Sequence, residues 1–193
     1  MKPASDSIRV MAGPPPPQAF LPARRAPRLY FAFAHACLFA GMVLLAAYPA
    51  ELGGFYYHPR LIAVVHLLTL GFVSSAILRA LYLVCPLPLR LPLPEGRADT
   101  VMALSWMVGV AGIASHFWIE LYPGMAWSGA MALATPVWLG SRVLAGLVRA
   151  PVPLEARLPI RLAIFNLYLG GGLGVMLGVN KHAPFLHFAQ LAG

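Results

Sequence analysis

The run from His58 to Cys85, HPRLIAVVHLLTLGFVSSAILRALYLVC, limits the fold of this chain more than any other stretch. As an α-helix, the 25 residues from Leu61 to Cys85 span roughly 37 Å, enough to cross a hydrocarbon core of ~30 Å. Two ionisable side chains interrupt this apolar run. His66 and Arg79 each lie about 7.5 Å inside one end of the helix. Ionisable groups at such depth usually face a bundle interior, a cofactor or water, so both are candidate site residues.

Composition supports a membrane protein. Hydrophobic residues make up 60% of the chain and charged residues only 10%, whereas a soluble domain carries about a quarter charged residues. The net charge of +8 is spread between apolar segments and does not form one patch. We therefore interpret it as a topology signal and not as a nucleic-acid surface. Cys37 and Cys85 lack CxxC spacing, which favours free thiols.

Apolar length predicts five membrane-spanning helices within residues 29–180, and so an all-α integral membrane bundle. The predicted spans are 29–48, 61–85, 101–119, 125–147 and 162–179.

Arginines gather on alternate loops and set the predicted orientation. They precede the first span, lie between the second and third, and lie between the fourth and fifth: Arg24, Arg25, Arg28; Arg90, Arg97; Arg149, Arg157, Arg161. The positive-inside rule then places the N-terminus in the cytoplasm, with the protein in the cell inner membrane.

The two ends of the chain lie outside the predicted bundle. Residues 1–28 are polar and rich in proline, which predicts a disordered cytoplasmic tail. Residues 181–193 are too short to span, and we interpret them as an outer-side tail or the start of a further helix. The pattern around His182 and His187 weakly repeats the one around His58 and His66, as expected of half of a longer repeated architecture.

Two histidines fall at similar depth near the outer face. His66 lies near the start of the second span and His116 near the end of the third. Helical steps back from His116 reach Gly112, Gly109 and Ser105, a groove for either a flat macrocycle or a neighbouring helix. Neutral imidazole is a common axial ligand of haem iron. His66 and His116 are therefore candidate haem and metal ligands, the alternative being that each is an interfacial or core side chain.

A second polar set is predicted in the inner half of the bundle, comprising His35, Arg79 and Asn166. Arg79 either extends to the membrane surface or anchors a propionate, a quinone carbonyl or a lipid head group. The predicted spans contain no carboxylate, which disfavours a proton or sodium carrier. The chain also lacks P-loop, GxSxG and HExxH motifs, so a hydrolase is unsupported.

The segment FYYHPRLIAVVHLLTLGFVSSAILRALYLV resembles the second helix of the haem-copper oxidase catalytic subunit superfamily, especially small members related to nitric oxide reductase. The resemblance implies that His66 binds a low-spin haem b near the outer face. The copper ligands of that family lie on later helices, so the implied protein is an oxidoreductase component resembling the N-terminal half of subunit I. It is not a complete oxidase.

Three functions follow from these observations. The first is a haem b protein for electron transfer or gas and redox sensing, with Arg79 as a distant anchor. The second is a non-catalytic subunit or assembly factor of a respiratory complex. In that case the glycines at 170, 174 and 178 would contact a second copy or a partner membrane subunit. The third is a small transporter or channel, which the lack of a repeat with broken helices disfavours.

Overall fold

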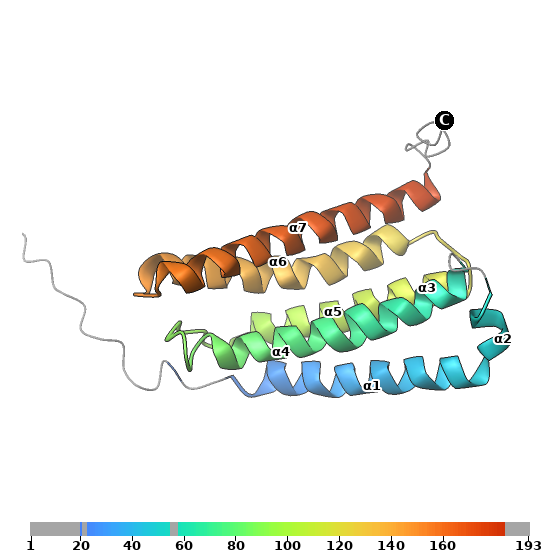
Figure 1. Cartoon of the computed structure of the whole chain (residues 1–193). Helices are drawn as coiled ribbons and strands as arrows, with labels where there is room; N and C mark the ends of the chain where they lie inside the picture. Colours follow the sequence, from blue (N-terminus) through green and yellow to red (C-terminus); the bar gives the residue numbers. More distant parts are fainter. Residues whose placement is uncertain (1–19, 21–22, 55–57, 184–193) are drawn as a thin grey trace, which may run out of the picture.

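The structure, a computed structural model, describes residues 20, 23–54 and 58–183, and across them its regular secondary structure is helical, with no strand. It confirms the all-α prediction, with five helices long and apolar enough to cross a membrane (Figure 1). The fold is therefore that of a multi-pass membrane protein. The elements are α1 Arg25–Ala47, α2 Pro49–Leu52, α3 Pro59–His66, η2 Leu67–Ser74, α4 Ser75–Val84, α5 Arg97–Trp118, α6 Met125–Arg149 and α7 Leu154–His182.

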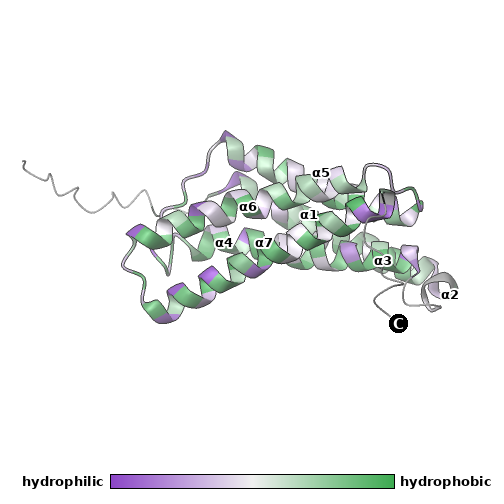
Figure 2. Ribbon diagram, turned by 90° about the horizontal axis from the view of Figure 1, so that it is seen from above, coloured by the Kyte–Doolittle hydropathy of each residue, from purple (hydrophilic) through white to green (hydrophobic). Residues whose placement is uncertain are grey.

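The five spans run up and down, with α3, η2 and α4 forming one continuous span (Figure 1). We call the end where α1 begins the proximal end and the opposite end the distal end. The α4–α5 and α6–α7 connections lie at the proximal end, as the predicted alternation requires. Purple, hydrophilic residues gather toward the helix ends, and the middle of the bundle is mostly apolar (Figure 2).

The helices extend beyond the predicted apolar spans. α1 begins at Arg25, α5 at Arg97 and α7 at Leu154, which is eight residues before its predicted start. A hydropathy pattern marks only the apolar part of a helix, whereas first turns readily accept proline and charged residues. Most of the predicted tail and all of residues 184–193 lie outside the described residues.

The second span contains a π-helical segment, η2. Two hydroxyls bond to carbonyls five residues earlier, Ser74 to Thr69 at 3.0 Å and Ser75 to Leu70 at 3.4 Å. Such bonds stabilise the wider turn, and π-helical turns occur often at functional sites. At Gly71 an added Cβ would lie 2.6 Å from the Cys37 side chain, so glycine is what lets η2 pack closely against α1.

The small residues of α5 pack against α6. A Cβ on Gly109 would lie 2.5 Å from the Ala132 nitrogen, and one on Gly112 would meet the Ser128 hydroxyl at 2.4 Å. The Ser105 hydroxyl donates to the Met131 carbonyl at 3.0 Å. Of the two occupants predicted for this groove, the structure shows the neighbouring helix.

Candidate functional site

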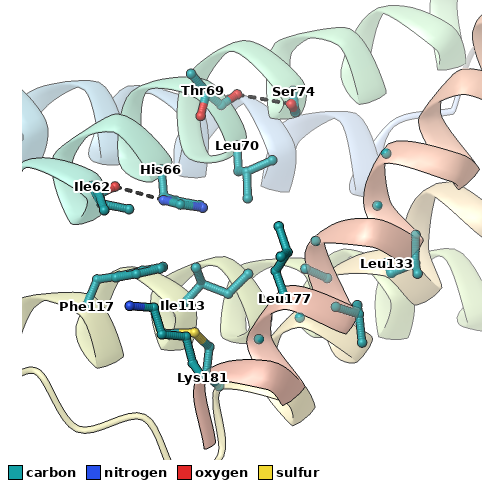
Figure 3. A pocket seen from close by; sticks show the side chains of 18 of the residues that line it. Ile62, His66, Thr69, Leu70, Ser74, Ile113, Phe117, Leu133, Leu177 and Lys181 are labelled. Carbon is teal, nitrogen blue, oxygen red and sulfur yellow. Dashed lines mark hydrogen bonds between the residues drawn. The ribbon is translucent and has the colours of Figure 1, made fainter. Parts of the chain in front are cut away.

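A cavity of about 1040 Å³ lies between the α3–η2 span and α7, with α5 and α6 completing its walls (Figure 3). Its lining is mostly apolar. The polar side chains on its wall come from three of the five spans and from the α5–α6 turn: His66, Thr69, Ser74, Trp106, Tyr122, Asn166, Asn180 and Lys181.

His66 lies on this wall with its ring fixed in orientation (Figure 3). Its Nδ1–H donates to the Ile62 carbonyl oxygen at 2.8 Å. Its ring stacks on Phe117, with centroids 5.1 Å apart and planes inclined by 22°. A carbonyl oxygen only accepts hydrogen bonds, so Nδ1 carries the proton and Nε2 keeps a free lone pair. This is how a protein prepares a histidine to bind a metal.

The hydroxyls closest to His66 along the same span already donate hydrogen bonds to backbone carbonyls. Thr69 donates to the Val65 carbonyl at 2.7 Å, and Ser74 donates to the Thr69 carbonyl at 3.0 Å. These hydroxyls can therefore offer only oxygen lone pairs to a ligand. The strongest metal-binding atom on this wall is then His66 Nε2.

The opposite wall is a smooth glycine surface on α7. Added Cβ atoms on Gly170 and Gly174 would meet nothing within 4 Å, and both residues line the cavity. Gly171 faces Leu133, and Gly178 lies close to Ala126, so these two pack against α6. The glycine stripe therefore packs closely on α6 on one side and leaves open space along the cavity on the other.

His116 does not line the cavity, although it lies at the distal end like His66. Its Nδ1–H donates to the Leu121 carbonyl at 2.6 Å, across the α5–α6 turn. A Cβ on Gly124 would lie 3.3 Å from its Nε2, and Gly124 has a φ of +89° that favours glycine. The structure therefore places the His116 side chain against the α5–α6 turn and does not bring it together with His66.

Arg79 lies toward the other end of the bundle. Its guanidinium carbon is 4.3 Å from the centroid of the Phe31 ring, and His35 also contacts that ring, with centroids 4.1 Å apart. The third member of the predicted inner set, Asn166, lines the His66 cavity instead. The structure thus brings together His35 and Arg79 but separates both from Asn166.

The remaining histidines have local or undescribed roles. His58 is the N-cap of α3 and accepts a hydrogen bond from the Arg60 backbone N–H at 3.3 Å. The His182 side chain and all of His187 lie outside what the structure describes.

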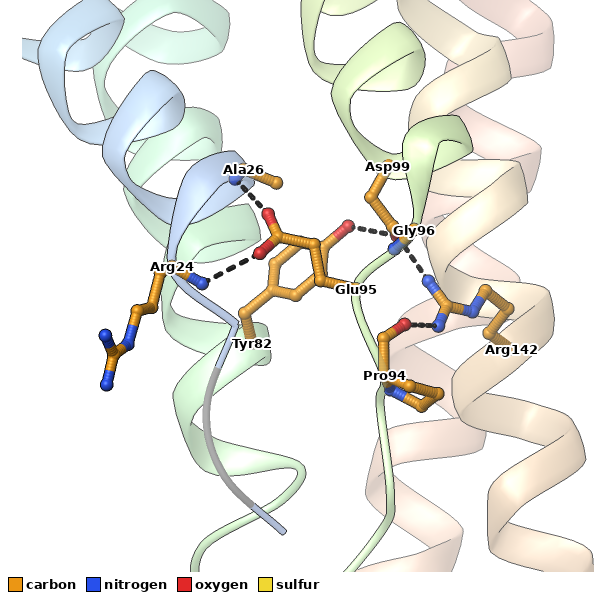
Figure 4. A network of polar contacts seen from close by, with 8 residues as sticks. All are labelled: Arg24, Ala26, Tyr82, Pro94, Glu95, Gly96, Asp99 and Arg142. Carbon is orange, nitrogen blue, oxygen red and sulfur yellow. Dashed lines mark hydrogen bonds and ion pairs between the residues drawn. The ribbon is translucent and has the colours of Figure 1, made fainter. Parts of the chain in front are cut away.

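A polar network at the proximal end was missed by sequence reasoning (Figure 4). Asp99 is only 2% exposed and lies in the first turn of α5, two residues before the predicted third span begins at Val101. It accepts hydrogen bonds from the Tyr82 hydroxyl at 2.7 Å and the Gly96 N–H at 2.8 Å. It also forms an ion pair with Arg142, whose other nitrogen donates to the Pro94 carbonyl.

Glu95 extends this network to α1. Its carboxylate accepts backbone hydrogen bonds from Arg24, Arg25 and Ala26 at 2.9, 3.1 and 2.5 Å, so it caps the α1 N-terminus from another part of the chain (Figure 4). Partial burial raises the pKa of Glu95, but the three N–H donors outweigh burial and hold that pKa below its usual value.

No group of three or more histidine, cysteine, aspartate or glutamate side chains within the described ranges is arranged to hold a metal ion. A haem differs from such a site because its macrocycle supplies four ligands and the protein adds one or two. No family model matches the chain, and no curated protein or solved structure is significantly similar to it.

Proposed function

We propose that this chain is a membrane haem b protein in which His66 is the axial ligand, serving electron transfer or gas and redox sensing. One observation carries the proposal. His66 presents a free Nε2 to an apolar cavity of about 1040 Å³ while its Nδ1–H is held by the Ile62 carbonyl. An oriented imidazole in an apolar pocket is what axial ligation of haem iron requires.

The residues around the cavity fit a macrocycle. The surface at Gly170 and Gly174 has no side chains, and Phe117 holds the His66 ring from one side. When bound, haem supplies an iron that exchanges one electron or binds a diatomic gas. The protein's contribution is to orient His66, to exclude water with apolar walls, and to keep Nδ1 protonated.

His66 is the only histidine on the cavity wall among the described residues. His66 would therefore hold the haem, and its iron would supply the redox or gas-binding chemistry. His116 is assigned a structural role in the α5–α6 turn. Arginines at the proximal end and the positive-inside rule support a cytoplasmic N-terminus in the cell inner membrane.

The test is a reduced-minus-oxidised optical spectrum of the full chain, purified in detergent after expression with added haem precursor. We expect a b-type spectrum that is lost in His66→Ala and retained in His116→Ala. A shift of the reduced Soret band on adding carbon monoxide would show that the iron binds a gas. Far-UV circular dichroism of both variants separates loss of haem from loss of fold.

Two results would refute the proposal. A colourless wild type, obtained with adequate haem, would show that the cavity holds no haem. A spectrum unchanged by His66→Ala would place any haem on another residue.

A second candidate is a non-catalytic membrane subunit that binds a second copy or a partner through α7. The supporting observation is that α7 packs chiefly on α6, while Gly172 faces open space and does not line the cavity. Small residues of this kind let helices approach closely in a membrane. A Gly172→Cys variant should form a disulfide-linked dimer in membranes, and Val148→Cys, exposed on α6, is the control. Equal cross-linking of both variants would contradict a specific α7 contact.

A further inference from the structure

A groove at the proximal end gathers three arginines beside apolar side chains. It has a volume of about 240 Å³ and lies between the start of α1 and α4. Arg79 follows His66 by 13 residues, or roughly 20 Å of helix. The groove is therefore separate from the His66 cavity and too distant to serve a ligand bound there. It is lined by Ala23, Arg24, Pro27, Arg28, Phe31, Arg79 and Leu83.

The arginines of this groove lack an ion-pair partner among the described residues. Within the described part of the chain, no carboxylate forms an ion pair with Arg24, Arg28 or Arg79. The nearest candidate is Glu95, but its two oxygens accept from the backbone N–H groups at the start of α1. Three arginines thus line one groove without an ion-pair partner among the described carboxylates.

Of the three arginines, Arg79 gives the clearest evidence for a bound anion. It lies five residues before the end of α4, about 7.5 Å along the helix, and is only partly exposed. Its guanidinium is held over the Phe31 ring at 4.3 Å. A cation kept at this depth is costly unless an anion or water meets it. The aromatic contact fixes its position without neutralising its charge.

The groove has both charged and apolar walls. Arg24 and Arg28 precede Phe31 along the chain and lie nearer the proximal end, Phe31 lies beside Arg79, and Leu83 lies one residue before the end of α4. Phe31 is 44% exposed on the outer surface of the bundle, where acyl chains would lie. Basic pockets between membrane helices are known sites for anionic lipid head groups.

We propose that this groove binds the phosphate of an anionic phospholipid, with Arg79, Arg28 and Arg24 contacting the phosphate and Phe31 contacting the first acyl segments. Guanidinium groups suit this role because they bind phosphate oxygens in a bidentate manner. The inference depends on the membrane-spanning fold and is independent of whether haem binds His66.

The test is a binding titration of the full chain in neutral detergent, using phosphatidylglycerol and phosphatidylcholine with identical acyl chains, and inorganic phosphate as a third probe. We expect tighter binding of phosphatidylglycerol than of phosphatidylcholine. Arg79→Gln and Arg28→Gln should each weaken phosphatidylglycerol binding roughly fivefold, as about one juxtamembrane basic residue contributes. Inorganic phosphate should neither bind measurably nor compete.

Arg149→Gln is the matched control, because Arg149 is exposed at the same end of the bundle and its loss changes the charge equally. Arg149→Gln should leave the affinity for phosphatidylglycerol within about twofold of wild type. Arg28 is exposed, so Arg28→Gln keeps the test valid if Arg79→Gln does not fold. Equal binding of both lipids, or an equal effect of Arg149→Gln, would overturn the proposal. Binding of inorganic phosphate as tight as that of phosphatidylglycerol would indicate an ion site in place of a lipid site.

Discussion

The Asp99–Arg142 ion pair should be the strongest single polar contribution to the stability of this bundle. Asp99 is 2% exposed and the Arg142 side chain 23% exposed, so both are largely removed from water. Removing one member of a buried pair destabilises by about 3–5 kcal/mol, because it leaves an uncompensated buried charge. Arg142→Met leaves Asp99 with two hydrogen bonds, from Tyr82 and Gly96. We therefore expect the loss of unfolding free energy to lie at the lower end of this range, about 3 kcal/mol.

A double-mutant cycle isolates the pair from other effects of each substitution. Asp99→Asn removes the charge while keeping the shape, and Arg142→Met removes the guanidinium while keeping most of the stem. We expect the double variant to be more stable than the sum of the single effects by about 1.5–3 kcal/mol. Unfolding would be followed in mixed micelles by titration with a denaturing detergent, using far-UV circular dichroism. Additive effects, within about 0.5 kcal/mol, would refute the reasoning.

Two further stability predictions use the same assay. Glu95→Gln should lose about 0.5–1 kcal/mol of N-terminal capping at neutral pH, whereas Glu155→Gln, exposed in the first turn of α7, should not. The folded pKa of Glu95 is lowered, so its stabilisation is complete above the ordinary pKa of 4.5 and is lost as the pH falls through the folded value. Wild type and Glu95→Gln should therefore converge in acid, and a constant difference would count against a charged cap. Gly109→Ala should destabilise by about 1–3 kcal/mol because its Cβ would overlap the α6 backbone, while Gly172→Ala should be neutral or stabilising.

The five spans were predictable because hydropathy adds up along the chain and needs no knowledge of partners. The depth of each residue along its helix was also predictable, since each residue advances an α-helix by a fixed rise. Depth alone, however, says nothing about rotation around the helix axis. His66 and His116 lie toward the same end of the bundle, yet one faces the cavity and the other the α5–α6 turn. The sequence therefore indicated both histidines and did not separate them.

The Asp99 network was missed for a different reason. Asp99 and Arg142 are 43 residues apart, and their contact exists only when α5 and α6 pack together. A signal was nevertheless present. Arg142 lies inside the predicted fourth span, and a charge at such a position implies a partner. With only six carboxylates in the chain, Asp99 and Glu95, just before the third span, were the candidates to consider.

The two polar features can be perturbed separately because they involve different helices. The proximal network joins α1, α4, α5 and α6 through Glu95, Tyr82, Asp99 and Arg142, and α7 takes no part in it. The glycine wall belongs to α7, which is fixed to α6 where the Tyr168 hydroxyl donates to the Val137 carbonyl at 3.0 Å. Weakening the ion pair should therefore lower stability without changing the spectrum of any haem bound at His66. His66→Ala should change that spectrum with little loss of stability, because the His66 ring contributes one hydrogen bond to its own helix and one stacking contact.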